Sequence, residues 1–279
     1  MNVNELINKH GFRFSKKYGQ NFIGDENLLA AIVTDAGVTE SDAVIEIGAG
    51  AGTLTRQIAL KAKKVISFEI DRSLEPVLGE SLAEVSNAEI IFDDVMEYSS
   101  ERIDEIAGGK FRLVANLPYY ITTPVLFKLF ECKNMISATV MVQKEVAERI
   151  CAKQATPEYG ALSVALQTKS KPVVTRIVKR TCFTPPPNVD SAIVRMDRVY
   201  RSDVSSPQTL EKLTRAAFAM RRKTLVNNLT SAMNVSRADA EALLTACDIP
   251  VMTRGEALSV EQFIRLSNLI AENDGKYNK

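Results

Sequence analysis

Residues 43–55 read AVIEIGAGAGTLT, and the architecture of the chain is built around them. An apolar strand pattern (43–47) runs directly into Gly48, Gly50 and Gly52, and a helical pattern begins at Thr53. Glycine permits a tight strand-to-helix turn and lets a ligand approach the main chain closely. Several classes of nucleotide-binding fold share a GxG turn, so this turn indicates a nucleotide-like ligand without choosing among those classes.

From Ala43 to Gln143, apolar strand patterns alternate with helical patterns. The expected strands are AVIEI (43–47), KVISFE (64–69), EIIF (89–92), FRLVAN (111–116) and ISATVMVQ (136–143), with helices at 53–62, 72–85, 99–107 and 122–132. Continuous apolar strands at this spacing predict a doubly wound, Rossmann-like α/β domain with a parallel sheet. Ligands of such a sheet bind beyond the carboxyl ends of its strands. A helix at 160–169 and strands at 172–179 and 191–198 are expected to follow.

The composition changes near Tyr200, where YRSDVSSPQ (200–208) is polar and turn-rich. This segment is typical of a linker. Helical patterns follow it at 208–219, 222–233, 236–246 and 259–272. The sequence therefore predicts a first domain over 1–199 and a small all-helical domain over 200–279.

Composition excludes several other classes of protein. The 279 residues contain no apolar run of the ~18 residues that a membrane-spanning helix needs, and the first residues lack the apolar core of a signal peptide. The four cysteines form no CxxC pair, and His10 is the single histidine, so neither a Cys/His zinc site nor a histidine-based triad is expected. Reduced thiols in a cytoplasmic protein without a metal are the simpler interpretation.

The formal net charge of +1 hides an uneven distribution. Residues 1–159 carry 17 Lys and Arg against 23 Asp and Glu, whereas residues 160–237 carry 14 against 4, a net charge of +10. Residues 238–279 carry 4 against 7. Such a split is typical of a basic face for a polyanion, although charges scattered over several faces would give the same totals.

Acidic residues accompany the glycine turn and the ends of the next two strands. Glu46 precedes the turn, Glu69 ends the second strand and Asp94 follows the third. Glu69 is placed to hold ribose hydroxyls, and Asp94 is placed to accept a hydrogen bond from an adenine amino group. Taken alone, Glu69 or Asp94 would be interpreted as a solvated carboxylate at the end of a strand, without a ligand. Together they fit S-adenosylmethionine (SAM) better than NAD, which does not require the third-strand carboxylate, and the set resembles a class I SAM-dependent methyltransferase.

The fourth strand runs into Asn116, Leu117, Pro118, Tyr119 and Tyr120. The exocyclic N6 of adenine is a poor nucleophile because its lone pair is conjugated with the ring. A side-chain amide oxygen and a carbonyl in a proline-stiffened turn can accept its hydrogens and favour tetrahedral nitrogen. A neighbouring aromatic ring can stack on a base that has left its helix. The turn therefore predicts N6 methylation of adenine in RNA, with a plain Asn/Pro turn as the alternative.

Several motifs in order make the chain resemble the KsgA-type dimethyltransferases over about residues 10–273. They are GQNF (19–22), EIGAGAGTLT (46–55), FEID (68–71), DDVM (93–96), NLPYY (116–120), FTPPPNVDSAIV (183–194) and AMRRKTLVNNL (219–229). The resemblance implies transfer of two methyl groups from SAM to N6 of each of two adjacent adenines, in a hairpin loop near the 3′ end of 16S rRNA. It also implies a role in small-subunit biogenesis, a catalytic domain over 1–199 and an RNA- or ribosome-binding domain over 200–279.

Site residues follow from the resemblance by position. SAM would be contacted by Gln20, Asn21, Ile23, Gly48, Gly50, Glu69, Ile70, Asp94, Val95 and Asn116, and catalysis would involve Asn116, Leu117, Pro118, Tyr119 and Phe183. Two positions depart from the family pattern: Ala49 where proline is frequent, and Ile23 where leucine is frequent. Both changes are apolar and small.

Three segments have both a functional and a structural interpretation. Phe183, in a loop stiffened by three prolines, is expected to cover the target adenine together with Tyr119, or else to pack in the core. The segment 20–22 is expected to form a lid over the methionine end of SAM, or else an ordered arm. Arg221, Arg222 and Lys223 are expected to open a helix and bind RNA phosphates, or else to form a solvated helix face.

Other functions remain open at this point. The chain could be a large-subunit rRNA methyltransferase of the antibiotic-resistance type, or a non-catalytic assembly factor of the small subunit. A small-molecule methyltransferase has no use for the basic segment. The expected partner is 16S rRNA within the small ribosomal subunit or its precursor, bound by a monomer without a membrane.

Overall fold

The computed structural model describes residues 3–15, 18–233 and 235–273. The chain forms two compact units. The sheet unit comprises residues 1–147 and 171–198, and the helical unit comprises residues 148–170 and 199–279. Each unit has a hydrophobic core of its own.

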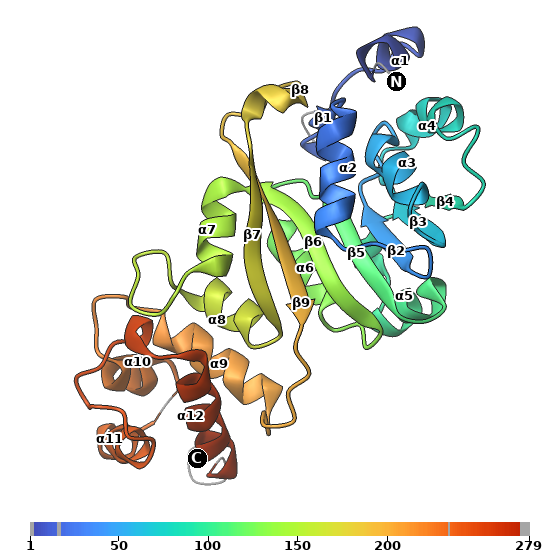
Figure 1. Ribbon diagram of the computed structural model, residues 1–279. Coiled ribbons are helices and arrows are strands. Elements are labelled where there is room, and N and C mark those ends of the chain that lie inside the picture. Colours follow the sequence, from blue (N-terminus) through green and yellow to red (C-terminus); the bar gives the residue numbers. More distant parts are fainter. Residues whose placement is uncertain (1–2, 16–17, 234, 274–279) are drawn as a thin grey trace. The chain divides into compact units, whose positions relative to one another are not determined.

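A seven-stranded sheet forms the centre of the sheet unit (Figure 1). Its strands, in spatial order, are β4 (Ala88–Ile91), β3 (Lys64–Phe68), β2 (Ala43–Ile47), β5 (Phe111–Asn116), β6 (Met135–Gln143), β9 (Ser191–Arg198) and β7 (Ser170–Val178). The first five are parallel, and β9 runs antiparallel to β6. The carboxyl ends of β4, β3, β2 and β5 therefore follow one another along a single edge.

Helices cover both faces of this sheet, which is why its central strands are apolar throughout. In Figure 1, α2 (Glu26–Asp35) lies in front of the sheet and α6 (Thr122–Leu129) lies behind it. The remaining helices of the region are α3 (Thr53–Ala59), α4 (Glu75–Ser81), α5 (Ser100–Ala107) and α7 (Lys144–Cys151). The single helix expected over 72–85 is instead a 3-10 turn, η2 (Arg72–Leu74), followed by α4, because Pro76 in the first turn of α4 starts a new helix.

Residues 3–15 and 18–23, which precede α2, form an arm of the sheet unit. Helix α1 (Val3–Lys9) buries Val3, Leu6 and Ile7 among residues that include Leu74 and Leu78. The arm ends in β1 (Phe22–Ile23), which pairs antiparallel with β8 (Phe183–Thr184). The expectations from the sequence did not include these elements, or α2, whose N-terminus is capped by the Asp25 side chain.

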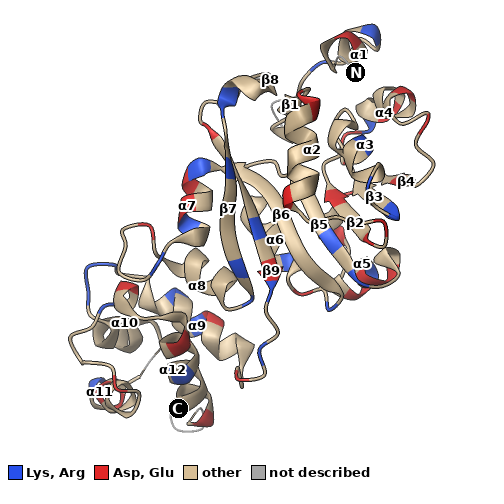
Figure 2. Cartoon of the chain, viewed as in Figure 1, with Lys and Arg blue, Asp and Glu red and all other residues tan. Residues whose placement is uncertain are grey.

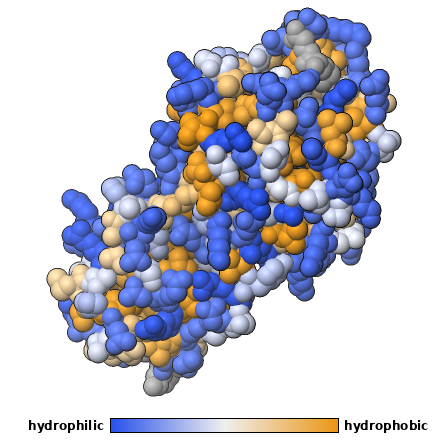
Figure 3. All heavy atoms as spheres, viewed as in Figure 1, coloured by the Kyte–Doolittle hydropathy of each residue, from blue (hydrophilic) through white to orange (hydrophobic). Residues whose placement is uncertain are grey.

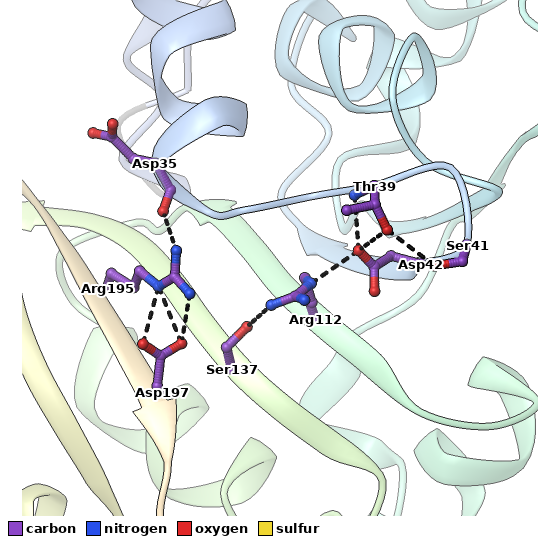
Figure 4. Close-up of polar contacts among 8 residues, drawn as sticks. All are labelled: Asp35, Thr39, Ser41, Asp42, Arg112, Ser137, Arg195 and Asp197. Carbon is purple, nitrogen blue, oxygen red and sulfur yellow. Dashed lines mark hydrogen bonds and ion pairs between the residues drawn. The ribbon is translucent and has the colours of Figure 1, made fainter.

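The amino-terminal edge of the sheet is tied together by ion pairs (Figure 4). Arg112, at the start of β5, pairs with Asp42 at 3.0 Å and donates a hydrogen bond to the Ser137 hydroxyl on β6. Arg195 on β9 pairs with Asp197 and donates to the backbone carbonyl of Asp35 at 2.9 Å. These cations belong to the architecture of the sheet, on the edge opposite the carboxyl ends of the parallel strands.

The helical unit consists of α8 (Ala161–Gln167), α9 (Pro207–Ala217), α10 (Leu225–Ala232), α11 (Arg237–Ala246) and α12 (Val260–Glu272). Side-chain oxygens of Ser206, Thr224, Ser236 and Ser259 cap the last four helices. The unit begins earlier than the boundary expected at residue 200, because residues 148–170 pack with it. Tyr159 is buried in its core and meets the ring of Phe218, which stacks on Phe263.

Within the described part of the chain, no helix combines the length and apolar composition needed to cross a membrane. The face drawn in Figure 3 is mostly hydrophilic, with apolar areas scattered between polar ones. All four cysteines are free thiols.

Candidate active site

A pocket lies at the carboxyl edge of the parallel strands, as the sheet topology predicts. Every residue expected to contact the cofactor lines it: Gln20, Asn21, Ile23, Gly48, Gly50, Glu69, Ile70, Asp94, Val95 and Asn116. Leu117, Pro118 and Tyr119 line the same pocket. Residues from the arm and from four strand ends thus converge on one cavity.

The glycine turn after β2 has a backbone that other residues rarely adopt. Gly48, Gly50 and Gly52 all have positive φ, with +57° at Gly50 and +77° at Gly52. A Cβ on Gly50 would lie 3.0 Å from a ring carbon of Phe22, and one on Gly52 would lie 2.8 Å from the Ser81 hydroxyl. Glycine is therefore required here both by conformation and by the close approach of the arm.

Glu69 follows β3 and is only 6% exposed. Its two carboxylate oxygens accept hydrogen bonds from the backbone N–H groups of Gly50 at 2.9 Å and of Asp71 at 2.8 Å. Burial raises the pKa of this carboxyl above its ordinary value, and the backbone donors partly oppose that shift. Each oxygen retains a lone pair, so the group can also accept hydrogen bonds from a pair of hydroxyls.

Asp94 follows β4 and caps a short 3-10 turn, η3 (Val95–Glu97). One of its oxygens accepts a hydrogen bond from the backbone N–H of Met96 at 2.9 Å. The other oxygen accepts no hydrogen bond from the described residues, and Asp94 is one of the residues that line the pocket. Its neighbour Asp93 also lines the pocket, but the oxygens of Asp93 already accept from Asp94 N–H and the Tyr98 hydroxyl.

The turn after β5 places an amide in the pocket with its oxygen available. Asn116 donates from Nδ2 to the backbone carbonyl of Asn21 at 3.0 Å, and among the described residues no donor reaches its Oδ1. The Pro118 carbonyl is already used, because it accepts from Ile121 N–H and the Thr122 hydroxyl. The half-buried Tyr119 ring is held by a 2.9 Å hydrogen bond between its hydroxyl and that of Ser191.

The arm contributes a complete wall of the pocket, from Tyr18 to Ile23. Sequence reasoning did not assign a site role to several of the lining residues, namely Tyr18, Gly19, Asp93 and Tyr120, whereas Phe22 belongs to the segment expected to form a lid. Gly19 has a φ of +58°, and a Cβ there would lie 3.7 Å from the Tyr120 ring. The contact between the arm and the turn after β5 joins two motifs that the sequence shows separately, GQNF (19–22) and NLPYY (116–120).

Of the two places expected for Phe183, the structure gives its side chain the one in the core. Its side chain is 3% exposed, packs with Leu29 and Val178 in the core, and is absent from the lining of the pocket. Its backbone pairs with Ile23, which does line the pocket. In this structure β8 therefore directs the Phe183 ring into the core, beneath the arm. The ring does not offer an exposed surface on which a base could stack.

Arg221, Arg222 and Lys223 also differ from expectation. They lie in the turn before α10, which begins at Leu225 because Thr224 caps it. Arg221 pairs with Glu256 at 3.3 Å and donates to the Pro157 carbonyl. The side chains of Arg222 and Lys223 are exposed and have no polar partner among the described residues.

The basic excess over 160–237 is only partly available to a ligand. Figure 2 shows Lys and Arg at separate positions along β7 and β9, and several basic residues of this segment are engaged within the sheet unit. Arg176 makes a two-pronged contact with Asp35, and Lys179 pairs with Asp190. The segment is also divided between the two units, so its charge total does not describe a single face.

Glu46 is fully buried behind the glycine turn and does not line the pocket. One oxygen accepts a hydrogen bond from the Thr55 hydroxyl at 2.6 Å, and the other has no partner among the described residues. Ser67 is its register partner on β3. Burial raises the pKa of Glu46 to about 8, and the nearby Glu69 adds to this shift.

The parallel sheet, the glycine turn and the strand-end carboxylates define a class I methyltransferase domain. Solved structures agree with this class: a dimethyladenosine transferase from Plasmodium falciparum has a TM-score of 0.78 and 28% identity, covering 91% of this chain and 98% of that one. The 23S rRNA methyltransferase ErmE has a TM-score of 0.69 and 25% identity, covering 89% of this chain and 98% of that one. The chain belongs to the ribosomal RNA adenine dimethylase family, whose pattern matches residues 11–272.

Curated relatives are similar over almost their full length. The chain is 46% identical to a protein of Bacillus mycoides (strain KBAB4) named ribosomal RNA small subunit methyltransferase A, over 95% of this chain and 94% of the relative. It is 45% identical, with the same coverage, to the protein of that name in Bacillus cereus (strain AH187).

Proposed function

We propose that this chain transfers methyl groups from SAM to N6 of two adjacent adenines, two to each, in a hairpin loop near the 3′ end of 16S rRNA. The main support is Asn116, whose amide oxygen is unclaimed in a pocket that it shares with Glu69 and Asp94. Membership of the adenine dimethylase family and the small-subunit names of the relatives support the choice of RNA. The same names favour this substrate over the large-subunit alternative.

In this proposal SAM binds along the strand ends. The oxygens of Glu69 accept hydrogen bonds from its ribose hydroxyls, and the free oxygen of Asp94 accepts one from the adenine amino group. The glycine turn leaves room for the methionine part beside Gly48 and Asn21. A ligand with a neutral ribose and adenine and a zwitterionic methionine tail fits this pocket better than a pyrophosphate, which the carboxylates of Glu69 and Asp94 would repel.

The target adenine approaches the turn after β5. Asn116 Oδ1 accepts one N6 hydrogen, and the Leu117 carbonyl accepts the other, since the Pro118 carbonyl is already bonded. N6 then attacks the methyl carbon as the bond from carbon to sulfur breaks, leaving S-adenosylhomocysteine. The N6 proton becomes acidic as nitrogen gains the methyl group and passes to solvent, so no histidine base is needed. The Tyr119 ring, which lines the pocket, then stacks on the base.

The helical unit is the proposed RNA- or ribosome-binding part, with Arg222 and Lys223 as the exposed cations of its basic turn. We further propose that the chain works as a cytoplasmic monomer without a metal. Its free cysteines suit a reducing compartment.

Mass spectrometry of small-subunit RNA from a strain lacking this gene tests the proposal. The deletion strain should lack two adjacent N6,N6-dimethyladenosines that the parent strain contains. Expression of the wild-type chain should restore both, and expression of Asn116→Ala, the matched control, should not. A deletion strain with unchanged small-subunit RNA would overturn the proposal.

A further inference from the structure

The arm and the cofactor pocket are joined by a chain of hydrogen bonds that centres on Asp71. This residue follows β3 by three positions, is 7% exposed, and is not part of the pocket lining. Its backbone N–H donates to Glu69 at 2.8 Å, and Glu69 in turn accepts from the glycine turn at Gly50. Asp71 therefore helps to orient the carboxylate that we place on the ribose.

The side chain of Asp71 faces the arm. One oxygen accepts a 2.6 Å hydrogen bond from Gln20 Nε2, across 51 residues of sequence. The other accepts from the backbone N–H and the hydroxyl of Ser73, at 3.0 and 2.6 Å. Ser73 thus fixes the rotamer of Asp71, whose other oxygen makes a partly buried, charge-assisted hydrogen bond with the arm.

Gln20 has both ends of its amide committed. Its Nε2 donates to Asp71, and its Oε1 accepts from the backbone N–H of Ser15 at 2.8 Å. Although Gln20 lines the pocket, its amide is a connector within the arm rather than a free ligand group. The arm is also held at Asn21, whose carbonyl accepts from Asn116.

We propose that Gln20 and Asp71 form a latch that closes the arm over bound SAM, with Asp71 acting as a positioning residue for Glu69. The inference rests on the proposed function, because it takes SAM as the occupant of the pocket. Opening the latch removes one wall of the pocket and the Gln20 bond that helps to hold Asp71, whose backbone N–H donates to Glu69. SAM retention and arm closure are thereby coupled.

A polarity swap tests the latch in the full-length chain. Gln20→Glu places a second carboxylate 2.6 Å from Asp71 and should force the arm away. Adding Asp71→Asn restores the hydrogen bond with its polarity reversed, because the new amide N–H of residue 71 can donate to the new carboxylate of residue 20. The amide oxygen at position 71 can still accept from Ser73. Ser73→Ala is the matched control, because it removes one bond to Asp71 without touching Gln20.

Two readouts separate a latch from a general effect on folding. The first is the SAM dissociation rate after a chase with unlabelled SAM, and the second is hydrogen exchange at residues 18–23 with and without SAM. Gln20→Glu should speed dissociation about tenfold or more and abolish the protection that SAM gives the arm. The double variant should return to within about threefold of wild type. Thermal melting of the SAM-free variants shows whether each remains folded.

The outcomes discriminate between the latch and the function on which it rests. Wild type that retains SAM, together with a Gln20→Glu variant that releases it at the wild-type rate, would overturn the latch alone. A double variant no better than Gln20→Glu would do the same. Wild type that does not bind SAM at all would overturn the proposed function and the latch with it.

Discussion

Asn116 and Asn21 are joined by a 3.0 Å hydrogen bond from the Asn116 amide to the Asn21 carbonyl, although 95 residues separate them in the chain. This bond directs the Asn116 oxygen into the pocket, because the nitrogen of the same amide is held by the arm. The turn after β5 and the arm thus line one pocket, and the geometry of the amide depends on both.

We expect Asn116→Ala to slow methyl transfer more than it weakens RNA binding. The amide oxygen stabilises N6 most as nitrogen becomes tetrahedral, so its loss should lower the single-turnover rate by about 10²–10³-fold. Asn116→Asp is the matched variant: it keeps an oxygen but cannot donate to Asn21, and should show an intermediate rate. A wild-type rate in Asn116→Ala would remove this residue from the mechanism.

Asp94→Ala is expected to weaken SAM binding by ~1–3 kcal/mol, because the adenine amino group loses its acceptor. Isothermal titration calorimetry measures the change directly. Asp93→Ala is the control from the same pocket, since the oxygens of Asp93 already bond to Asp94 and Tyr98. Equal SAM affinity in wild type and Asp94→Ala would contradict the assignment of the adenine end.

The raised pKa of Glu46 predicts how stability depends on pH. The folded-state pKa is about 8 against an ordinary value of 4.5, so the neutral acid is favoured by folding. Below pH 4.5 the protonated Glu46 contributes its full share to the free energy of unfolding. As the pH rises from 4.5 toward about 8, this share falls by up to about 1.4 kcal/mol per pH unit. Glu46→Gln mimics the neutral acid, keeping an acceptor for Thr55.

Urea unfolding at about pH 5 and about pH 8 checks this prediction. The stability advantage of Glu46→Gln over wild type should be larger at the higher pH. The same advantage at both pH values would mean that the proton on Glu46 does not matter to folding.

Phe183→Ala should reduce the free energy of unfolding by ~3–5 kcal/mol, because a buried aromatic ring leaves a cavity. Phe183→Leu keeps most of the apolar volume and should lose less stability while retaining methyl transfer. Chemical denaturation measures the free energy of unfolding of both variants, and single-turnover kinetics measures their rate of methyl transfer. A stable Phe183→Leu with strongly reduced transfer would return the ring to the substrate-stacking role expected from the sequence.

The basic turn of the helical unit should contribute unequally to RNA binding. Reversing Arg222 and Lys223 to Glu should weaken binding to small-subunit particles and make its salt dependence shallower, by about 0.7–0.9 per lost phosphate contact. Arg221→Ala should change the salt dependence little, because Glu256 and Pro157 already engage this side chain. Filter binding at several salt concentrations, beside SAM titration of the same variants, provides the comparison. An unchanged slope after both reversals would show that the turn is ordinary surface.

The sheet and the strand-end residues could be predicted because their signals are local. The strands at 43–47, 111–116 and 191–198 have the predicted bounds, and strand ends that follow one another in parallel must meet at one edge. Thr224 was an available helix-start signal that would have placed Arg221–Lys223 outside α10.

The arm could not be predicted in the same way. Its β1 has only two residues and exists because it pairs with β8, near the other end of the sheet unit's sequence. That pairing also turns Phe183 inward, so its burial depends on a tertiary contact. The bond from Gln20 to Asp71 likewise joins segments that no periodicity connects.

The most direct measurement is in vitro methylation of small ribosomal subunits purified from a strain that lacks this gene. The particles are incubated with the full-length chain and SAM, and the RNA is then digested and examined by mass spectrometry. Our account predicts two adjacent N6,N6-dimethyladenosines in a single fragment near the 3′ end of 16S rRNA, and none with Asn116→Ala. Small-subunit RNA that stays unmodified while large-subunit RNA gains methyl groups would contradict it.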